Sequence, residues 1–253
     1  MLGTGSGTGT YSATFIENIS VGTISTVNGT WSILLQSNTL TMESSTPSTL
    51  GVALSGTGSL IKSGTSTLTV GSVNNFSGGT TISGGTLALT NTNTSVGPVT
   101  INSGGTLAYA DSAALPNSTA LTLAGGTLSL SGAYSPAFTP PLGLLASSTI
   151  NFGSGLGASA MAFGNSSGQS WTGTLTILNY STGSDTIRFG TNASGLAGGQ
   201  LSVINFGGIA AQIDSNGFVT PVPEPSTYAA LLGLGAMAFV ALRRRQARLE
   251  PAS

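Results

Sequence analysis

Charged side chains are scarce in this sequence. Six Lys or Arg and seven Asp or Glu residues make up about 5% of the 253 residues, whereas soluble domains average about 25%. Residues 1–220 contain five acidic and two basic side chains, which gives a net charge of −3: Glu17, Glu43, Lys62, Asp111, Asp185, Arg188 and Asp214. Nucleic-acid binding needs clustered Lys and Arg against phosphates, so we expect no nucleic-acid partner.

Cysteine and histidine are absent altogether. Without cysteine there are no disulfides and no thiolate metal sites. Without histidine the chain lacks the commonest general base and metal ligand. The five acids of residues 1–220 stand singly in the sequence, whereas glycosidases place two carboxyl groups about 5–10 Å apart. We therefore predict no catalytic, cofactor-binding or metal-binding residues, and a protein that is not an enzyme.

Glycine, serine and threonine are abundant instead, and between residues 56 and 132 they form a repeat. The segment TTISGGTLAL at 80–89 recurs as VTINSGGTLAY at 99–109 and as LTLAGGTLSL at 121–130. The leucine that follows threonine falls at Leu68, Leu87, Leu107 and Leu128, in almost equal steps. Short strands that recur with such a regular period are typical of a solenoid.

The geometry of each repeat follows from strand alternation. Leu87 and Leu89 share one face of a strand, and Thr86 and Ala88 share the other. A glycine pair can turn the chain at a corner, because glycine accepts positive φ. Stacked coils then predict two inward columns and one outward threonine ladder: Ile82, Ile101 and Leu123; Leu87, Leu107 and Leu128; Thr86, Thr106 and Thr127. We predict an all-β fold, a right-handed parallel β-helix followed by a small β module and a single C-terminal helix.

The composition divides the chain into five segments. Residues 1–55 contain β-rich runs that predict the start of the solenoid, and 56–132 hold the repeats. Residues 133–148 contain three prolines and are expected to form a linker or a cap. The alternating runs of 149–220 predict a C-terminal β module, for which a short antiparallel module and the capped end of the solenoid both remain open. Residues 221–248 form a distinct tail.

The tail combines prolines, an apolar stretch and arginines. Prolines at 221, 223 and 225 prevent a helix before Ser226. The uncharged stretch 228–242 is then followed by Arg243, Arg244 and Arg245. A helix of this length spans about 22 Å, less than the ~30 Å hydrocarbon core. The arginine cluster nevertheless acts as a stop signal on the cytoplasmic side, so we predict a transmembrane helix at 228–242.

These residues carry a family resemblance. The ordered motif, apolar helix and arginine cluster resemble the PEP-CTERM sorting signal of Gram-negative bacteria over residues 220–246. The resemblance implies Sec export, temporary anchoring in the inner membrane, cleavage by an exosortase-type protease, and release to the cell surface or matrix. It assigns the membrane stop to the three arginines and the sorting motif to five residues: Val222, Pro223, Glu224, Pro225 and Ser226. The start of the chain, MLGTGSG, has no signal peptide, so we expect a truncated N-terminus or a misassigned start codon.

The repeats also resemble a known family. Residues 58–89 are similar to the autotransporter-associated β-strand repeat, with Ser66 where the family usually has Gly and Phe76 where it often has Tyr. The two later copies are degenerate. The resemblance supports a β-helix, so the sequence predicts a non-catalytic, exported surface or extracellular-matrix protein with a structural or adhesive role.

Three alternatives remain at this stage. One is a secreted carbohydrate-binding or carbohydrate-active β-helix domain, with an extracellular polysaccharide as partner and acids or aromatics clustered on one face. In another, the tail stays uncut as a permanent anchor. The threonine ladder could itself bind a glycan or a flat crystalline surface, although outward threonine is also the default for a charge-poor β surface. Asp185 and Arg188 are expected to form a surface pair rather than a site.

Overall fold

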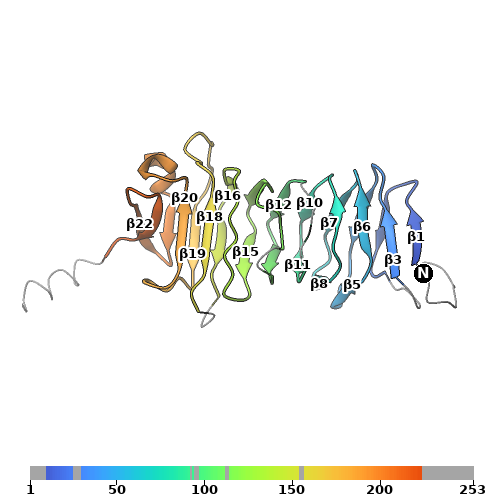
Figure 1. Cartoon of the computed structure of the whole chain (residues 1–253). Coiled ribbons are helices and arrows are strands. Elements are labelled where there is room, and N and C mark those ends of the chain that lie inside the picture. Colours follow the sequence, from blue (N-terminus) through green and yellow to red (C-terminus); the bar gives the residue numbers. More distant parts are fainter. Residues whose placement is uncertain are drawn as a thin grey trace, which may run out of the picture. The chain divides into compact units, whose positions relative to one another are not determined.

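The computed structural model describes residues 10–24, 30–91, 93, 97–111, 114–153 and 157–223. The chain separates into two compact units, Met1–Thr220 and Pro221–Ser253. In the first unit, each short strand pairs in parallel with the equivalent strand of the next repeat, so that successive coils stack as a β-solenoid (Figure 1). This confirms the all-β solenoid predicted from the repeat.

The described strands form three sheets. Sheet 1 contains β1 (Thr10–Thr14), β3 (Thr30–Leu34), β6 (Ala53–Gly56) and β9 (Asn75–Phe76). Sheet 2 contains β2 (Ile19–Val21), β4 (Thr39–Met42), β7 (Ser59–Lys62), β10 (Thr80–Ile82), β12 (Val99–Asn102), β14 (Leu121–Ala124) and β16 (Gly143–Ala146). A coil visits the sheets in turn, as β6, β7 and β8 do.

Sheet 3 is the largest. Its first eight strands pair in parallel: β5 (Ser48–Leu50), β8 (Thr67–Val70), β11 (Gly85–Leu89), β13 (Gly105–Tyr109), β15 (Thr127–Leu130), β17 (Ser148–Asn151), β19 (Leu175–Leu178) and β21 (Ile204–Phe206). The sheet is completed by β22 (Ile209–Ile213), β23 (Phe218–Pro221), β20 (Thr186–Phe189) and β18 (Ala160–Phe163). Helix in the described residues is limited to α1 (Gly198–Leu201) and η1 (Ala193–Gly195).

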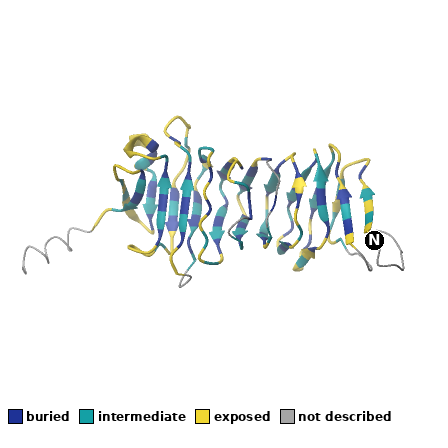
Figure 2. Ribbon diagram, in the orientation of Figure 1, coloured by how far each residue is buried: buried dark blue, intermediate teal, exposed yellow. Residues whose placement is uncertain are grey.

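The core consists of the predicted columns. Leu68, Leu87, Leu107 and Leu128 are aligned on neighbouring strands of sheet 3 and are almost fully buried. In sheet 2 the column of Ile82, Ile101 and Leu123 continues to Leu144. Buried and partly exposed residues alternate along the strands (Figure 2), as expected when one face of each strand packs inward. Both inward columns are therefore confirmed.

The glycine pairs lie at the corners between sheets 2 and 3. Gly85, Gly104 and Gly125 have φ values of +60°, +80° and +100°, a region that other residues rarely adopt. A different constraint acts on Gly126, where an added Cβ would lie 2.4 Å from Cγ2 of Ile101 in the preceding coil. The repeat thus needs one glycine for its conformation and another for close approach of neighbouring coils.

The C-terminal part of this unit continues the coils. Strands β17, β19 and β21 extend sheet 3 in parallel, and β18 pairs in parallel with β20. The last two strands reverse direction, since β22 is antiparallel to β21 and β23 is antiparallel to β20. Of the two alternatives for residues 149–220, the structure has the capped end of the solenoid.

The proline-containing segment 133–148 also belongs to the stack. Its strand β16 pairs with β14, and Phe138, Leu142 and Leu144 are buried in the core. Backbone N–H groups of Phe138 and Thr139 donate to neighbouring coils, at Ala162 O and Asn117 O. The prolines therefore lie within a coil, and the boundaries of the five predicted segments remain a prediction.

Candidate functional site

The predicted sorting motif begins directly after the last strand. Val222 and Pro223 are described and exposed. Glu224, Pro225, Ser226, the helix predicted at 228–242 and Arg243, Arg244 and Arg245 lie outside the described residues. Among the residues that the structure describes, no helix has the length and apolar character needed to cross a membrane.

The acidic side chains of the solenoid have different environments. Glu17, Glu43 and Asp214 are exposed, Asp111 is half-buried and Asp185 is buried. Within the described ranges, no three Asp or Glu residues are grouped so that they could hold a metal ion.

Asp185 and Arg188 were expected to form a pair on the surface. This prediction is wrong for Asp185, because that residue is only 5% exposed. Its Oδ1 accepts a hydrogen bond from the backbone N–H of Ser159 (2.9 Å), and its Oδ2 accepts one from Ser181 (2.7 Å). A buried carboxylate needs such donors. The bond from Ser159 links the chain before β18 to the turn before β20, and the bond from Ser181 lies within that turn. Burial, and then the negative charge of Asp185, raise the pKa of Tyr180.

The burial of Lys62 was not predicted from the sequence. This residue is fully buried and occupies an inward position of sheet 2, paired with Met42 on one side and Ile82 on the other. Its Nζ donates to the carbonyl oxygens of Gly64 and, at 3.1 Å, Gly84. Burial lowers the pKa of this ammonium group below its ordinary value of 10.5. The signal was available in the repeat, because Lys62 aligns with Ile82 of the following coil.

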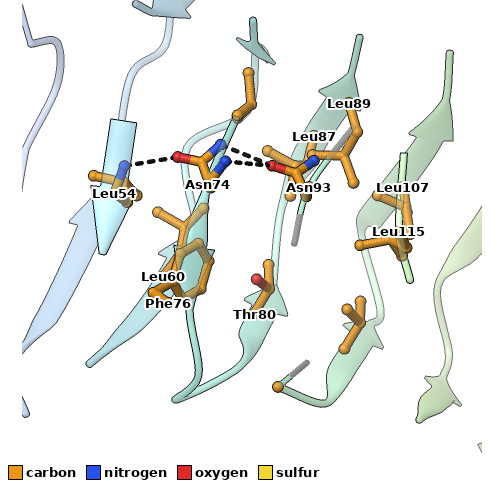
Figure 3. A pocket seen from close by; sticks show the side chains of 13 residues that line it. Leu54, Leu60, Asn74, Phe76, Thr80, Leu87, Leu89, Asn93, Leu107 and Leu115 are labelled. Atoms are coloured by element: carbon orange, nitrogen blue, oxygen red, sulfur yellow. Dashed lines mark hydrogen bonds between the residues drawn. The ribbon is translucent and has the colours of Figure 1, made fainter. Parts of the chain in front are cut away.

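A second buried polar feature connects successive coils. The Oδ1 atom of Asn74 accepts from the backbone N–H of Leu54 (2.8 Å), and its Nδ2 donates to Oδ1 of Asn93 (2.8 Å) (Figure 3). Asn93 Nδ2 in turn donates to Ala114 O at 2.9 Å. The adjoining cavity, of about 20 Å³, is lined mainly by Leu, Val and Phe. This is room for about one water molecule, so we interpret the asparagine pair as structural.

The predicted threonine ladder is present on the outward face of sheet 3. Thr86, Thr106 and Thr127 are aligned and half-buried. The same row extends to Thr67 on one side and to Thr149 and Thr176 on the other. Because neighbouring strands lie about 4.8 Å apart, the row is a regular line of uncharged, β-branched side chains.

The two tryptophans contribute to packing. Trp31 is buried and stacks on Tyr11 with ring centroids 4.7 Å apart. Trp171 donates from Nε1 to Leu142 O (2.9 Å) and contacts the edge of Phe189. Phe138, Phe163 and Phe189 stack in the interior along three coils. These aromatic rings therefore contribute to the packing of the core.

Sequence models of two families match the chain. Residues 60–89 and 84–108 match the passenger-associated transport repeat, and residues 221–245 match the PEP-CTERM protein-sorting motif. The chain carries passenger-associated repeats and a PEP-CTERM sorting motif. The first match falls on the solenoid from β7 to β13, and the second begins at the end of β23. No curated protein and no solved structure matches the chain.

The two matches give the functional class. The PEP-CTERM motif indicates export and sorting to the cell surface, and it is a substrate signal for processing by an exosortase. Passenger repeats in a β-solenoid agree with this destination. Together they indicate an exported surface protein.

Proposed function

We propose that this protein is a non-catalytic structural or adhesive component of the cell surface or extracellular matrix. The observation that carries the proposal is the order of its parts: a capped β-solenoid is followed immediately by the PEP-CTERM motif. The solenoid is the part displayed at the surface, and the tail is the sorting signal. The faces that the solenoid displays are largely uncharged, because residues 1–220 carry only five acidic and two basic side chains.

Two features of the solenoid support a structural role. Parallel pairing along sheets 2 and 3 links each coil to the next through backbone hydrogen bonds, and the inward columns bury aliphatic side chains along the same direction. The hairpin of β22 and β23 covers the strands of the final coil, which limits the exposed edge that would otherwise pair with other chains.

The placement of Asp185 supports a non-catalytic role. Both of its carboxylate oxygens accept backbone N–H groups, so its bonding serves the fold. A carbohydrate-active enzyme, the second class considered, would need a pair of carboxyl groups about 5–10 Å apart across a bound sugar. The carbohydrate-binding form of that alternative has support from an open pocket that Arg188 lines.

We propose that the tail acts in two steps. The apolar stretch 228–242, held by Arg243, Arg244 and Arg245, anchors the precursor temporarily in the inner membrane. An exosortase-type protease then cuts at the motif and releases the solenoid to the surface. The exposure of Val222 and Pro223 supports access of a protease to the start of the motif.

The experiment is replacement of the motif in the native host. Exchanging Pro223, Glu224 and Pro225 together for alanine should keep full-length protein in the inner-membrane fraction and deplete the surface fraction, because the protease loses its recognition sequence. Fractionation and immunoblotting measure this distribution. Ser215→Ala, at an exposed position in the β22–β23 turn, is the matched control and should be processed normally. Unchanged release of the triple variant would contradict the proposal.

A further inference from the structure

An open pocket of about 430 Å³ lies on the surface formed by β18, β20 and the coil before them. Its lining includes small residues: Ala137 and Ala162, which are bridged in parallel, and Gly164 and Gly190. Arg188 is the register partner of Ala162 on the next strand. The small residues leave a depression along three coils, and the long Arg188 side chain lines it at β20. The volume lies within the usual range of ligand sites, about 300–1,000 Å³.

Arg188 has a special position in this pocket. Its guanidinium carbon lies 5.8 Å from the centre of the Phe218 ring, a cation–π contact that restricts the side chain. In the described part of the chain its guanidinium makes no hydrogen bond or ion pair. The one other cation of the described residues, Lys62, is fully buried. Arg188 is therefore the accessible cation among the described residues of the solenoid. Phe218 restricts its side chain, and its N–H groups remain available to a ligand.

Two asparagines add further donors. Asn165 Oδ1 accepts from the backbone N–H and the hydroxyl of Ser167, at 3.0 and 2.7 Å. Asn192 Oδ1 accepts from the backbone N–H of Ser194 at 2.8 Å. These bonds fix both amide groups and leave their Nδ2 donors available. Among the described residues that line the pocket, none is acidic.

We propose that this pocket binds a carboxylate-bearing polysaccharide, such as a chain of uronic acids. Arg188 would receive the carboxylate through the paired N–H groups of its guanidinium, a geometry that suits carboxylates. Asn165 and Asn192 would donate to sugar hydroxyl or ring oxygens. The pocket is lined by residues of successive coils and is open to solvent, which suits one segment of an extended polymer. The choice of a polysaccharide over a free acid rests on the proposed function, since an exported surface protein meets such polymers outside the cell.

The test is binding of oligogalacturonate to the full chain by isothermal titration calorimetry. We expect binding that weakens as salt is raised, because the interaction is between charges. Arg188→Gln should weaken it about tenfold or more, since it removes a charge-assisted hydrogen bond to the carboxylate. Arg188→Lys should retain only part of the affinity, because lysine keeps the charge without the planar fork. A fully methyl-esterified oligomer has no free carboxylate. Its affinity for the parent protein should be no higher than the affinity of oligogalacturonate for Arg188→Gln.

Thr100→Ala on the outward face of β12 in sheet 2 is the matched control and should bind as the parent does. Thermal unfolding of each variant establishes that the fold is retained. The proposal is overturned if the parent does not bind oligogalacturonate, if Arg188→Gln binds equally well, or if the esterified oligomer binds as tightly. Sorting of Arg188→Gln in the native host should be normal, so failure of this proposal is distinguishable from failure of the sorting proposal.

Discussion

At the scale of single residues, Lys62 shows how a repeat can hold a polar group inside. Its neighbours in the inward column are Met42 and Ile82, yet its ammonium group reaches the carbonyls of Gly64 and Gly84 at two successive corners. Burial of an ammonium group without a carboxylate partner disfavours the charged form. Lys62 therefore links two coils, and the free energy needed to bury its ammonium group depends on pH.

The consequence is a pH-dependent free energy of unfolding. The folded-state pKa of Lys62 is lowered below its unfolded value of about 10.5, so between these two values the unfolded state binds more protons. Stability from this residue is fully present above the unfolded pKa and is lost as pH falls through the folded pKa. In urea denaturation at rising pH up to about 10.5, the parent should gain stability with pH relative to Lys62→Met. A difference that stays constant with pH would contradict this account.

Single residues also mark the limit of sequence analysis. Asn74 and Asn93 are separated by one period of the repeat, but nothing in the pattern distinguished them from other asparagines of a polar chain. Asp185 and Arg188 were expected to pair because they are close in sequence. The backbone donors that hold Asp185, on Ser159 and Ser181, belong to different coils, and only the stacking of those coils brings them together.

At the scale of elements, the corner between sheets 2 and 3 recurs in each repeat. Its position was predictable, because the glycine pair interrupts the strand alternation between Ile82 and Leu87. The reason for the second glycine was not, since it depends on the neighbouring coil. At Gly126 an added Cβ would lie 2.4 Å from Ile101 Cγ2 and 2.6 Å from Asn102 O.

Gly126→Ala should therefore destabilise the solenoid. The new methyl group forces backbone and side chains apart, and overpacking of this kind costs about 1–3 kcal/mol. Gly168→Ala is the matched control, because nothing lies within 4 Å of an added Cβ there, and it should change stability by less than about 0.5 kcal/mol. Denaturation midpoints of the two variants provide the comparison. Equal stability of Gly126→Ala and the parent would show that the coils can move apart freely.

The same scale explains why the C-terminal coils were harder to predict. Residues 133–148 lack the glycine-pair motif and contain prolines, so composition suggested a linker or cap. Their place in the stack is determined by inward Phe138, Leu142 and Leu144 and by hydrogen bonds to the coils on either side. Such pairing between distant parts of the chain leaves little local trace once the repeat has diverged.

At the scale of the whole molecule, the solenoid and the tail have separate tasks. The fold class, the inward columns and the threonine ladder followed from periodicity, and the surface destination followed from the PEP-CTERM motif. The partner of the displayed surface did not follow from either. The pocket at Arg188 is assembled from residues scattered between 117 and 192, so it emerges only when the coils are stacked.

The central claim is that the protein is displayed outside the cell after its tail is removed. Intact-mass analysis of the protein from fractionated native cells tests it most directly. The account predicts a surface or medium fraction whose mass lacks the apolar stretch 228–242 and Arg243, Arg244 and Arg245. Full-length protein confined to the inner membrane would contradict it, and the chain would then be a permanently anchored solenoid.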